Sequence, residues 1–234
     1  MGPVGKPGRR VAGIDLAGSP RRPTGYALLR GLRQISARVL SDDTSILEAV
    51  EVDAPNLAVI DAPLSLPRGR ATIDDRSGPH LRECDRELLR RGIRFFPLTL
   101  GPMRMLTTRG LELRHALEAR GIPVLEGYPG GSQDVLGIPR KQAGTDVLQR
   151  ALLRRGLGGV LDRRQLTHDE LDAVTIAWTG RLFLEGNGTL IGDPTEGLML
   201  LPGSALPPTR RGRRHSSGNA RPASRSSPGV RKGR

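Results

Sequence analysis

Apolar and polar residues alternate in blocks along the first 130 positions, and three of the apolar blocks end on a carboxylate. These runs are VAGID, which ends at Asp15, LAVID, which ends at Asp61, and IPVLE, which ends at Glu126. Short continuous apolar runs are typical of strands that are buried on both faces of a sheet. We therefore expect three strands that each end in an acidic residue.

The segments between these runs predict the order of the elements. TGYALLR and QISARVL follow the first run after short links, so the three runs together predict an antiparallel meander. A helix is expected over residues 44–52. The run LAVID should then return parallel to the first strand, because a strand-helix-strand connection places its two strands side by side.

Helical patterns dominate the second half of the chain. Helices are expected over residues 80–92 and 108–120, before the fifth strand IPVLE, and over residues 143–155 after it. The last helix begins at THDELDAVTIAWTG, where Thr167 and Glu170 form a Thr-x-x-Glu capping box. The sequence thus predicts an α/β fold: a mixed five-stranded sheet with a helical insertion after the fourth strand.

The charge of the chain is concentrated at its ends. The net charge is +13 over 234 residues, but residues 206–234 hold nine Lys or Arg and no acid, whereas residues 11–205 hold 25 basic and 24 acidic side chains. We expect one domain over residues 8–205 and a disordered basic tail over residues 206–234, since the tail is rich in Arg, Ser, Pro and Gly. Such a tail either binds a polyanion loosely or is an inert solubilising extension.

The composition also indicates the cellular compartment in which we expect the protein. Cys84 is the one cysteine, so no disulfide partner exists within the chain. No apolar run reaches the roughly 20 residues of a membrane span, and none resembles a signal sequence. We expect a cytoplasmic protein with no membrane partner.

The acidic strand ends indicate a metal site. If Asp15 and Asp61 end adjacent parallel strands, their side chains lie in one crevice, and Asp169 and Asp172 share one face of the last helix. Clustered carboxylates suit Mg²⁺ or Mn²⁺. A turn or a helix start explains each acid better than chemistry does when that acid is taken alone. Their combination on strand ends and one helix favours a metal site.

Several motifs resemble one known family. GIDLAGS, VIDAPLSLP, RECDRELLRRGI, LEGYPG, HDELDAVTIAWTG and IGDPTEGLMLLP occur in that order over residues 11–203. Together they resemble domain-of-unknown-function family 429, described as predicted nucleases with a ribonuclease H fold. The segment DELDAVTIA is similar to the last catalytic helix of Holliday-junction resolvases.

The resemblance implies a nuclease that hydrolyses phosphodiesters with two metal ions. It assigns metal binding to Asp15, Asp61, Asp169 and Asp172, with Asp15 bridging both ions. Glu126 matches a Glu-x-Tyr/His-Pro segment of the family and joins the expected catalytic residues without a defined role. Glu48 is the one counterpart of the glutamate that ribonucleases H carry on their first helix. His168 either assists proton transfer or belongs to the helix start.

A nucleic acid is the expected partner, although its type is open, as is the oligomeric state. Arg140 and Lys141 follow the YPGGS loop near the expected site and are the candidate substrate-binding residues. A stripe of arginines at positions 82, 86 and 90 is interleaved with acids and favours an ordinary solvated helix face. Three Phe, two Tyr and one Trp are too few for an extensive base-stacking platform.

Two other functions fit the same pattern. DLAGS resembles the first phosphate loop of sugar-kinase and actin-like ATPases, which share this core, but the chain lacks the length for two lobes and a convincing second glycine-rich loop. The protein could also be a non-catalytic nucleic-acid-binding or scaffold protein of the same fold, in which case the core acids are replaceable.

Overall fold

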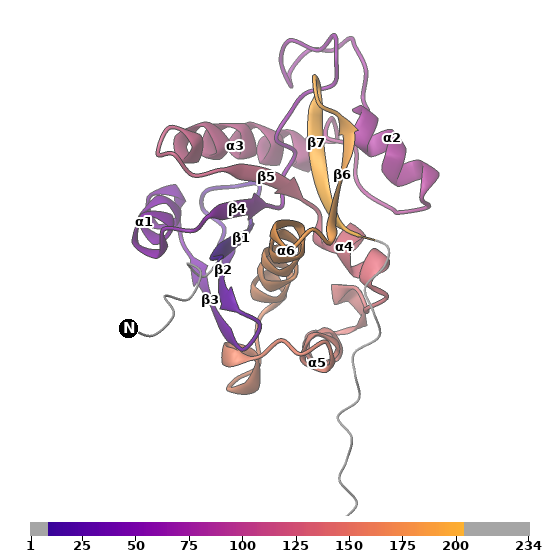
Figure 1. The fold of residues 1–234 in the computed structure, drawn as a ribbon. Coiled ribbons are helices and arrows are strands. Elements are labelled where there is room, and N and C mark those ends of the chain that lie inside the picture. The colour runs from indigo at the N-terminus through magenta and orange to yellow at the C-terminus, as the bar shows by residue number, and fades with distance from the viewer. Residues whose placement is uncertain (1–8, 204–234) are drawn as a thin grey trace, which may run out of the picture.

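A seven-stranded mixed sheet forms the centre of the molecule (Figure 1). This computed structural model describes residues 9–203, so the expected tail 206–234 lies outside the described residues. The order of the strands across the sheet is β3-β2-β1-β4-β5-β7-β6. The strands are β1 (Val11–Asp15), β2 (Thr24–Gly31), β3 (Gln34–Leu40), β4 (Leu57–Ile60), β5 (Val124–Gly127), β6 (Gly188–Asp193) and β7 (Gly197–Pro202).

The first five strands are those expected from the sequence. β1, β2 and β3 form an antiparallel meander, and β4 pairs parallel to β1 with Val11 opposite Leu57 and Ile14 opposite Ile60. β5 continues the parallel set beside β4. The carboxyl ends of β1, β4 and β5 therefore lie at one edge of the sheet, which confirms the predicted parallel return.

Helices cover both faces of the sheet (Figure 1). Side chains of α1 and α3 pack on one face against Ile14 and Ile60, and side chains of α5 and α6 pack on the other against Val11 and Val59. This double cover explains why β1 and β4 are apolar at nearly every position. The helices are α1 (Asp43–Asp53), α2 (Glu83–Arg90), α3 (Gly101–Glu118), α4 (Pro129–Leu136), α5 (Thr145–Arg154) and α6 (His168–Leu184), with short 3₁₀ turns η1 (Lys141–Ala143) and η2 (Gly159–Asp162).

Two features correct the expected fold. The sheet has seven strands rather than five, because β6 and β7 form a hairpin whose β7 edge extends the parallel set beside β5. A hydrophobic cluster joins this hairpin to α2 through Cys84, Leu88, Ile191 and Met199. α4 was expected as a loop. The helical insertion after the fourth strand is confirmed as α2 and α3, although α3 begins at Gly101 rather than at residue 108.

Candidate active site

Asp15 and Asp61 lie side by side at the carboxyl edge of the sheet. Asp15 is the last residue of β1 and Asp61 directly follows β4. The Asp61 amide donates a hydrogen bond to the Ile14 carbonyl oxygen at 2.9 Å, which continues the ladder between the two strands. The two carboxyl groups are close enough to influence each other's pKa. The predicted juxtaposition of these two acids is therefore present in the structure.

Two glycines bring α6 close to these strands. A Cβ atom on Gly25, the β2 residue opposite Asp15, would lie 2.1 Å from the backbone oxygen of Asp169. A Cβ on Gly13 would lie 2.1 Å from the backbone oxygen of Ala173. No larger residue fits either position, because such contacts are far inside van der Waals distance. The first turns of α6 can thus lie directly on β1 and β2.

The start of α6 is fixed by the predicted capping box. The Thr167 hydroxyl accepts a hydrogen bond from the Glu170 amide, and the Glu170 carboxylate accepts one from the Thr167 amide. Arg164 holds the buried Glu170 in place from the preceding loop. Asp169 is partly exposed, whereas Asp172 is buried one turn later and lies close enough to Asp15 and Asp61 to influence their pKa.

Asp172 has two polar partners from the segment that follows β5. Its Oδ1 accepts a hydrogen bond from Gln133 Nε2 at 2.9 Å, and its Oδ2 pairs with Lys141 Nζ at 2.8 Å. The Asp172 side chain is 4% exposed and that of Lys141 is 44% exposed. A buried carboxylate thus contacts an ammonium group that reaches it from solvent.

Burial and mutual repulsion act on the acids of this cluster. Burial is the largest influence, and it raises the pKa of Asp15 and Asp61 because the charged forms lose water. Repulsion from Asp61 and Asp172 raises the pKa of Asp15 further, well above its usual value. The pKa of Asp61 is raised to about 7, although Lys141 and the hydrogen bond with Asp15 act in the opposite direction. Burial and repulsion therefore favour the protonated forms of Asp15 and Asp61, and Lys141 offsets this only in part.

The same carboxylates stabilise the positive charge of Lys141. Partial burial disfavours its ammonium form, but attraction from Asp172, Asp15 and Asp61 outweighs burial and raises the pKa of Lys141. The other predicted substrate-binding residue, Arg140, pairs instead with Asp134 at 2.6 Å. The two neighbouring cations therefore have different surroundings.

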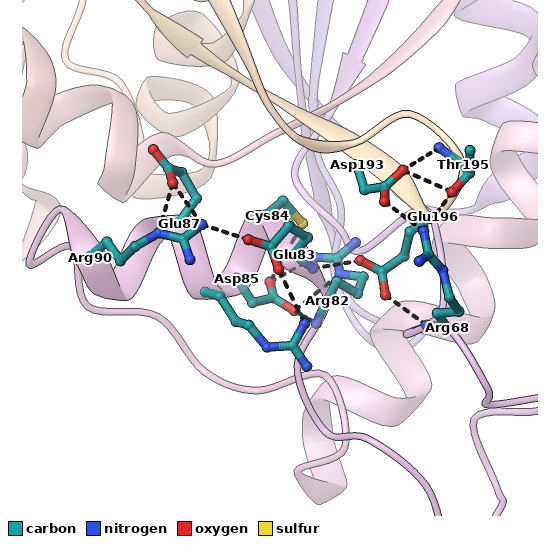
Figure 2. A network of polar contacts seen from close by, with 11 residues as sticks. Arg68, Arg82, Glu83, Cys84, Asp85, Glu87, Arg90, Asp193, Thr195 and Glu196 are labelled. Carbon is teal, nitrogen blue, oxygen red and sulfur yellow. Dashed lines mark hydrogen bonds and ion pairs between the residues drawn. The ribbon is translucent and has the colours of Figure 1, made fainter.

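Glu126 lies at the same sheet edge but already has a cationic partner. Both of its oxygens bind Arg82, at 2.6 and 2.7 Å, and both side chains are nearly inaccessible to solvent. Arg82 also binds Asp85, which Figure 2 shows beside it at the start of α2. Oε2 of Glu126 accepts a further hydrogen bond from the Leu64 amide, in the loop that follows Asp61. Glu126 therefore stabilises this loop through a hydrogen bond. Its catalytic role stays a prediction.

The arginine stripe of α2 divides into one buried and two exposed members. Arg82 is buried, whereas Arg86 and Arg90 are exposed and pair with acids of their own helix. Figure 2 shows Arg90 in contact with Glu83 and Glu87. These pairs agree with a solvated helix face for the outer part of the stripe.

The structure places the two remaining candidates differently. His168 is exposed at the start of α6 and lines an open hollow together with Lys141, Gln142 and Gly144. Glu48 is exposed on α1, whose buried face consists of other side chains, and it does not join the acids at the strand ends.

The contact of Gln133 with Asp172 was not predicted from the sequence. Gln133 is 1% exposed and orients Asp172 from α4, a helix that we expected to be a loop. Pro129 at the first position of α4 is a common helix start and could have indicated the helix. The contact between Gln133 and Asp172 depends on the tertiary packing of α4 on α6.

The meander followed by parallel β4 and β5, with acids at the ends of β1 and β4, defines a mixed α/β protein whose strand arrangement agrees with the one expected from the motifs. The chain belongs to the family described as protein of unknown function (DUF429), whose model matches residues 13–196. No curated protein matches the sequence.

Two solved structures of Thermus thermophilus RuvC are similar to this chain. RuvC in complex with a Holliday junction substrate is 14% identical, with a TM-score of 0.47 over 81% of this chain and 99% of that one. A second RuvC structure is 15% identical, with a TM-score of 0.40 over 76% of this chain and 96% of that one. Within residues 9–203, no helix is long and apolar enough to cross a membrane.

Proposed function

We propose that this protein is a divalent-metal-dependent nuclease that hydrolyses phosphodiester bonds. The observation that carries the proposal is that Asp15, Asp61 and Asp172, from three separate elements, lie near enough at one sheet edge for their charges to act on one another. A turn or a helix cap explains one acid at a time. It does not explain three that are gathered where burial and repulsion oppose their charges.

The chemistry of these residues fits Mg²⁺ or Mn²⁺. Both ions prefer oxygen ligands and bind a few carboxylates together with water or phosphate oxygens. In the part of the chain that the structure describes, neither Asp15 nor Asp61 forms an ion pair, so their charges are available to a cation. As they stand, no three His, Cys, Asp or Glu side chains of residues 9–203 converge closely enough to enclose an ion. The Asp172 carboxylate is instead engaged by Lys141.

We assign the roles from the positions of the side chains. Asp15, Asp61, Asp172 and Asp169 would hold the divalent ions, and Asp15 is the acid that the charges of the other three all influence. Bound ions would activate water and stabilise the leaving oxygen. Gln133 keeps Asp172 directed at the cluster, and Glu126 holds the loop after Asp61.

The substrate that fits this arrangement is a nucleic acid. The hollow beside the cluster is lined by Lys141 and His168, and Arg140 lies next to Lys141 in the chain. We propose that Lys141 and Arg140 contact phosphate groups of the substrate there. The basic tail 206–234 would add contacts to the phosphate backbone that do not depend on sequence.

The experiment is a cleavage panel with purified full-length protein. Branched, single-stranded, duplex and DNA–RNA hybrid substrates are incubated with Mn²⁺, with Mg²⁺ or with EDTA, and ATP hydrolysis is measured in parallel. We expect cleavage of at least one substrate class that EDTA abolishes. ATP turnover without cleavage would favour the kinase-like alternative, and no activity on any substrate would favour the scaffold alternative.

A further inference from the structure

Among residues 9–203, Lys141 is the one basic side chain that forms an ion pair with an acid of the Asp15, Asp61 and Asp172 cluster. Its ammonium lies 2.8 Å from Asp172, and it also attracts Asp15 and Asp61. It is also the only lysine among residues 9–203, where every other cation of the Lys/Arg type is an arginine. The cluster thus contains one compact, flexible monovalent cation.

The backbone next to Lys141 is anchored by several contacts, whereas the Lys141 side chain is held by its ion pair with Asp172. Arg140 binds Asp134 through two hydrogen bonds and lies over the ring of Tyr128, which fixes the backbone one residue earlier. The 3₁₀ turn η1 begins at Lys141 itself. The Lys141 side chain is nearly half exposed and borders the open hollow, so its ammonium can leave Asp172 without a change in the fold.

Within residues 9–203, both oxygens of Asp172 have polar partners. One oxygen of Asp172 is occupied by Lys141 and the other by Gln133. Gln133 is buried and orients the carboxylate, so Lys141 is the partner that a divalent cation can replace. A divalent ion carries twice the charge of the ammonium and binds several carboxylates at once.

Given the proposed metal-dependent function, we propose that Lys141 is the resident counter-ion of the metal-free site and competes with the divalent metal for Asp172. Metal binding then requires the ammonium to move from Asp172 toward the hollow. In the absence of metal, the lysine reduces the electrostatic repulsion among the clustered acids. It also lowers the metal affinity of the site, because its ion pair with Asp172 must break before the metal binds.

Isothermal titration calorimetry with Mn²⁺ on metal-free, full-length protein tests this proposal. We expect K141M to bind Mn²⁺ about fivefold more tightly than the wild type, which corresponds to one partly exposed ion pair. K141R should bind more weakly, because a guanidinium can hold the Asp172 carboxylate through two hydrogen bonds. Arg150→Met is the matched control: it removes one positive charge from an exposed pair with Asp146 and should leave the affinity within about twofold.

A second measurement follows Lys141 in the wild-type protein. In protein labelled with ¹³C-lysine, the signal of Lys141 is assigned by its loss in K141R, and it should move toward the position of a free lysine as Mg²⁺ is added. Mn²⁺ affinity equal in wild type and K141M, or a Lys141 signal that saturating Mg²⁺ leaves in place, would overturn the counter-ion proposal while the nuclease proposal stands. Absence of Mn²⁺ binding in both proteins would overturn both.

Discussion

Asp61 shows how a single side chain can be unfavourable for the metal-free fold. Its carboxyl group lies beside that of Asp15, and two charges about 4 Å apart repel by roughly 4 kcal/mol at a dielectric constant near 20. The pKa of Asp61 rises to about 7 in the folded protein, whereas an unfolded aspartate titrates near 3.9. The folded state therefore binds the proton more tightly, so the metal-free protein loses stability as the pH rises from about 4 through 7.

We predict that Asp61→Asn stabilises the metal-free protein at pH 8 by about 2 kcal/mol relative to the wild type. Asn keeps the shape of Asp but cannot be charged, so the difference should shrink toward zero at pH 5, where Asp61 is protonated. Urea denaturation at both pH values measures it. Asp146→Asn, an exposed acid, is the control and should change stability by less than about 0.5 kcal/mol at either pH. A variant less stable than the wild type at pH 8 would contradict the electrostatic explanation.

We predict a different result for Glu126→Gln. This change removes the charge that Arg82 contacts through two hydrogen bonds, and a buried ion pair that loses one partner typically costs about 3 kcal/mol. Urea denaturation measures the loss. The stabilisation of the protein by Mn²⁺ should persist in this variant if Glu126 acts as a brace. Loss of that stabilisation would instead support the predicted catalytic role of Glu126.

At the scale of elements, the sequence predicted best what depends on local patterns. The apolar runs ending at Asp15 and Asp61 predicted two adjacent parallel strands, and the capping box at Thr167 predicted the start of α6. The β6–β7 hairpin and α4 were not predicted. Their sequences contain several glycines, and their stability comes from contacts with distant elements such as α2 and α6.

The part of the candidate site that depends on local sequence patterns could be predicted, and the part that depends on tertiary contacts could not. A strand that ends in an acid places that acid at a known edge of a sheet, so Asp15 and Asp61 could be placed together. The pairing of Asp172 with Gln133 and Lys141 could not be predicted, since it requires the position of α4 and of the turn after it.

The close approach of α6 to the sheet yields a prediction at this scale. Gly25→Ala would place a Cβ atom 2.1 Å from the backbone of Asp169, so we expect a loss of stability of about 3 kcal/mol or more, because α6 must move. Gly101→Ala, at an open position where α3 begins, is the matched control and should be neutral or slightly stabilising. Thermal denaturation measures the stability of both variants relative to the wild type. Equal stability of Gly25→Ala and the wild type would show that α6 does not determine the packing at this edge.

At the scale of the whole chain, the surplus of positive charge lies in sequence segments other than those that carry the proposed catalytic acids. Residues 206–234 carry nine of the 37 basic side chains, and residues 11–205 are almost neutral overall. We predict that a protein ending at residue 205 retains its fold but binds nonspecific duplex DNA more weakly, with a smaller dependence of affinity on salt. Fluorescence anisotropy at several salt concentrations measures both quantities. An unchanged slope would mean that the tail is an inert extension.

The central claim is that Asp15, Asp61 and Asp172 form a metal site that cleaves phosphodiester bonds. Its most direct test is the cleavage rate of Asp61→Asn and Asp172→Asn under saturating Mn²⁺, on the substrate that the wild-type protein cleaves best. Both variants keep the size and turn-forming capacity of the acid and remove its charge. We predict folded variants whose cleavage rates fall by about 10²-fold or more, since each loses a metal ligand. Cleavage at the wild-type rate in both variants would contradict the claim.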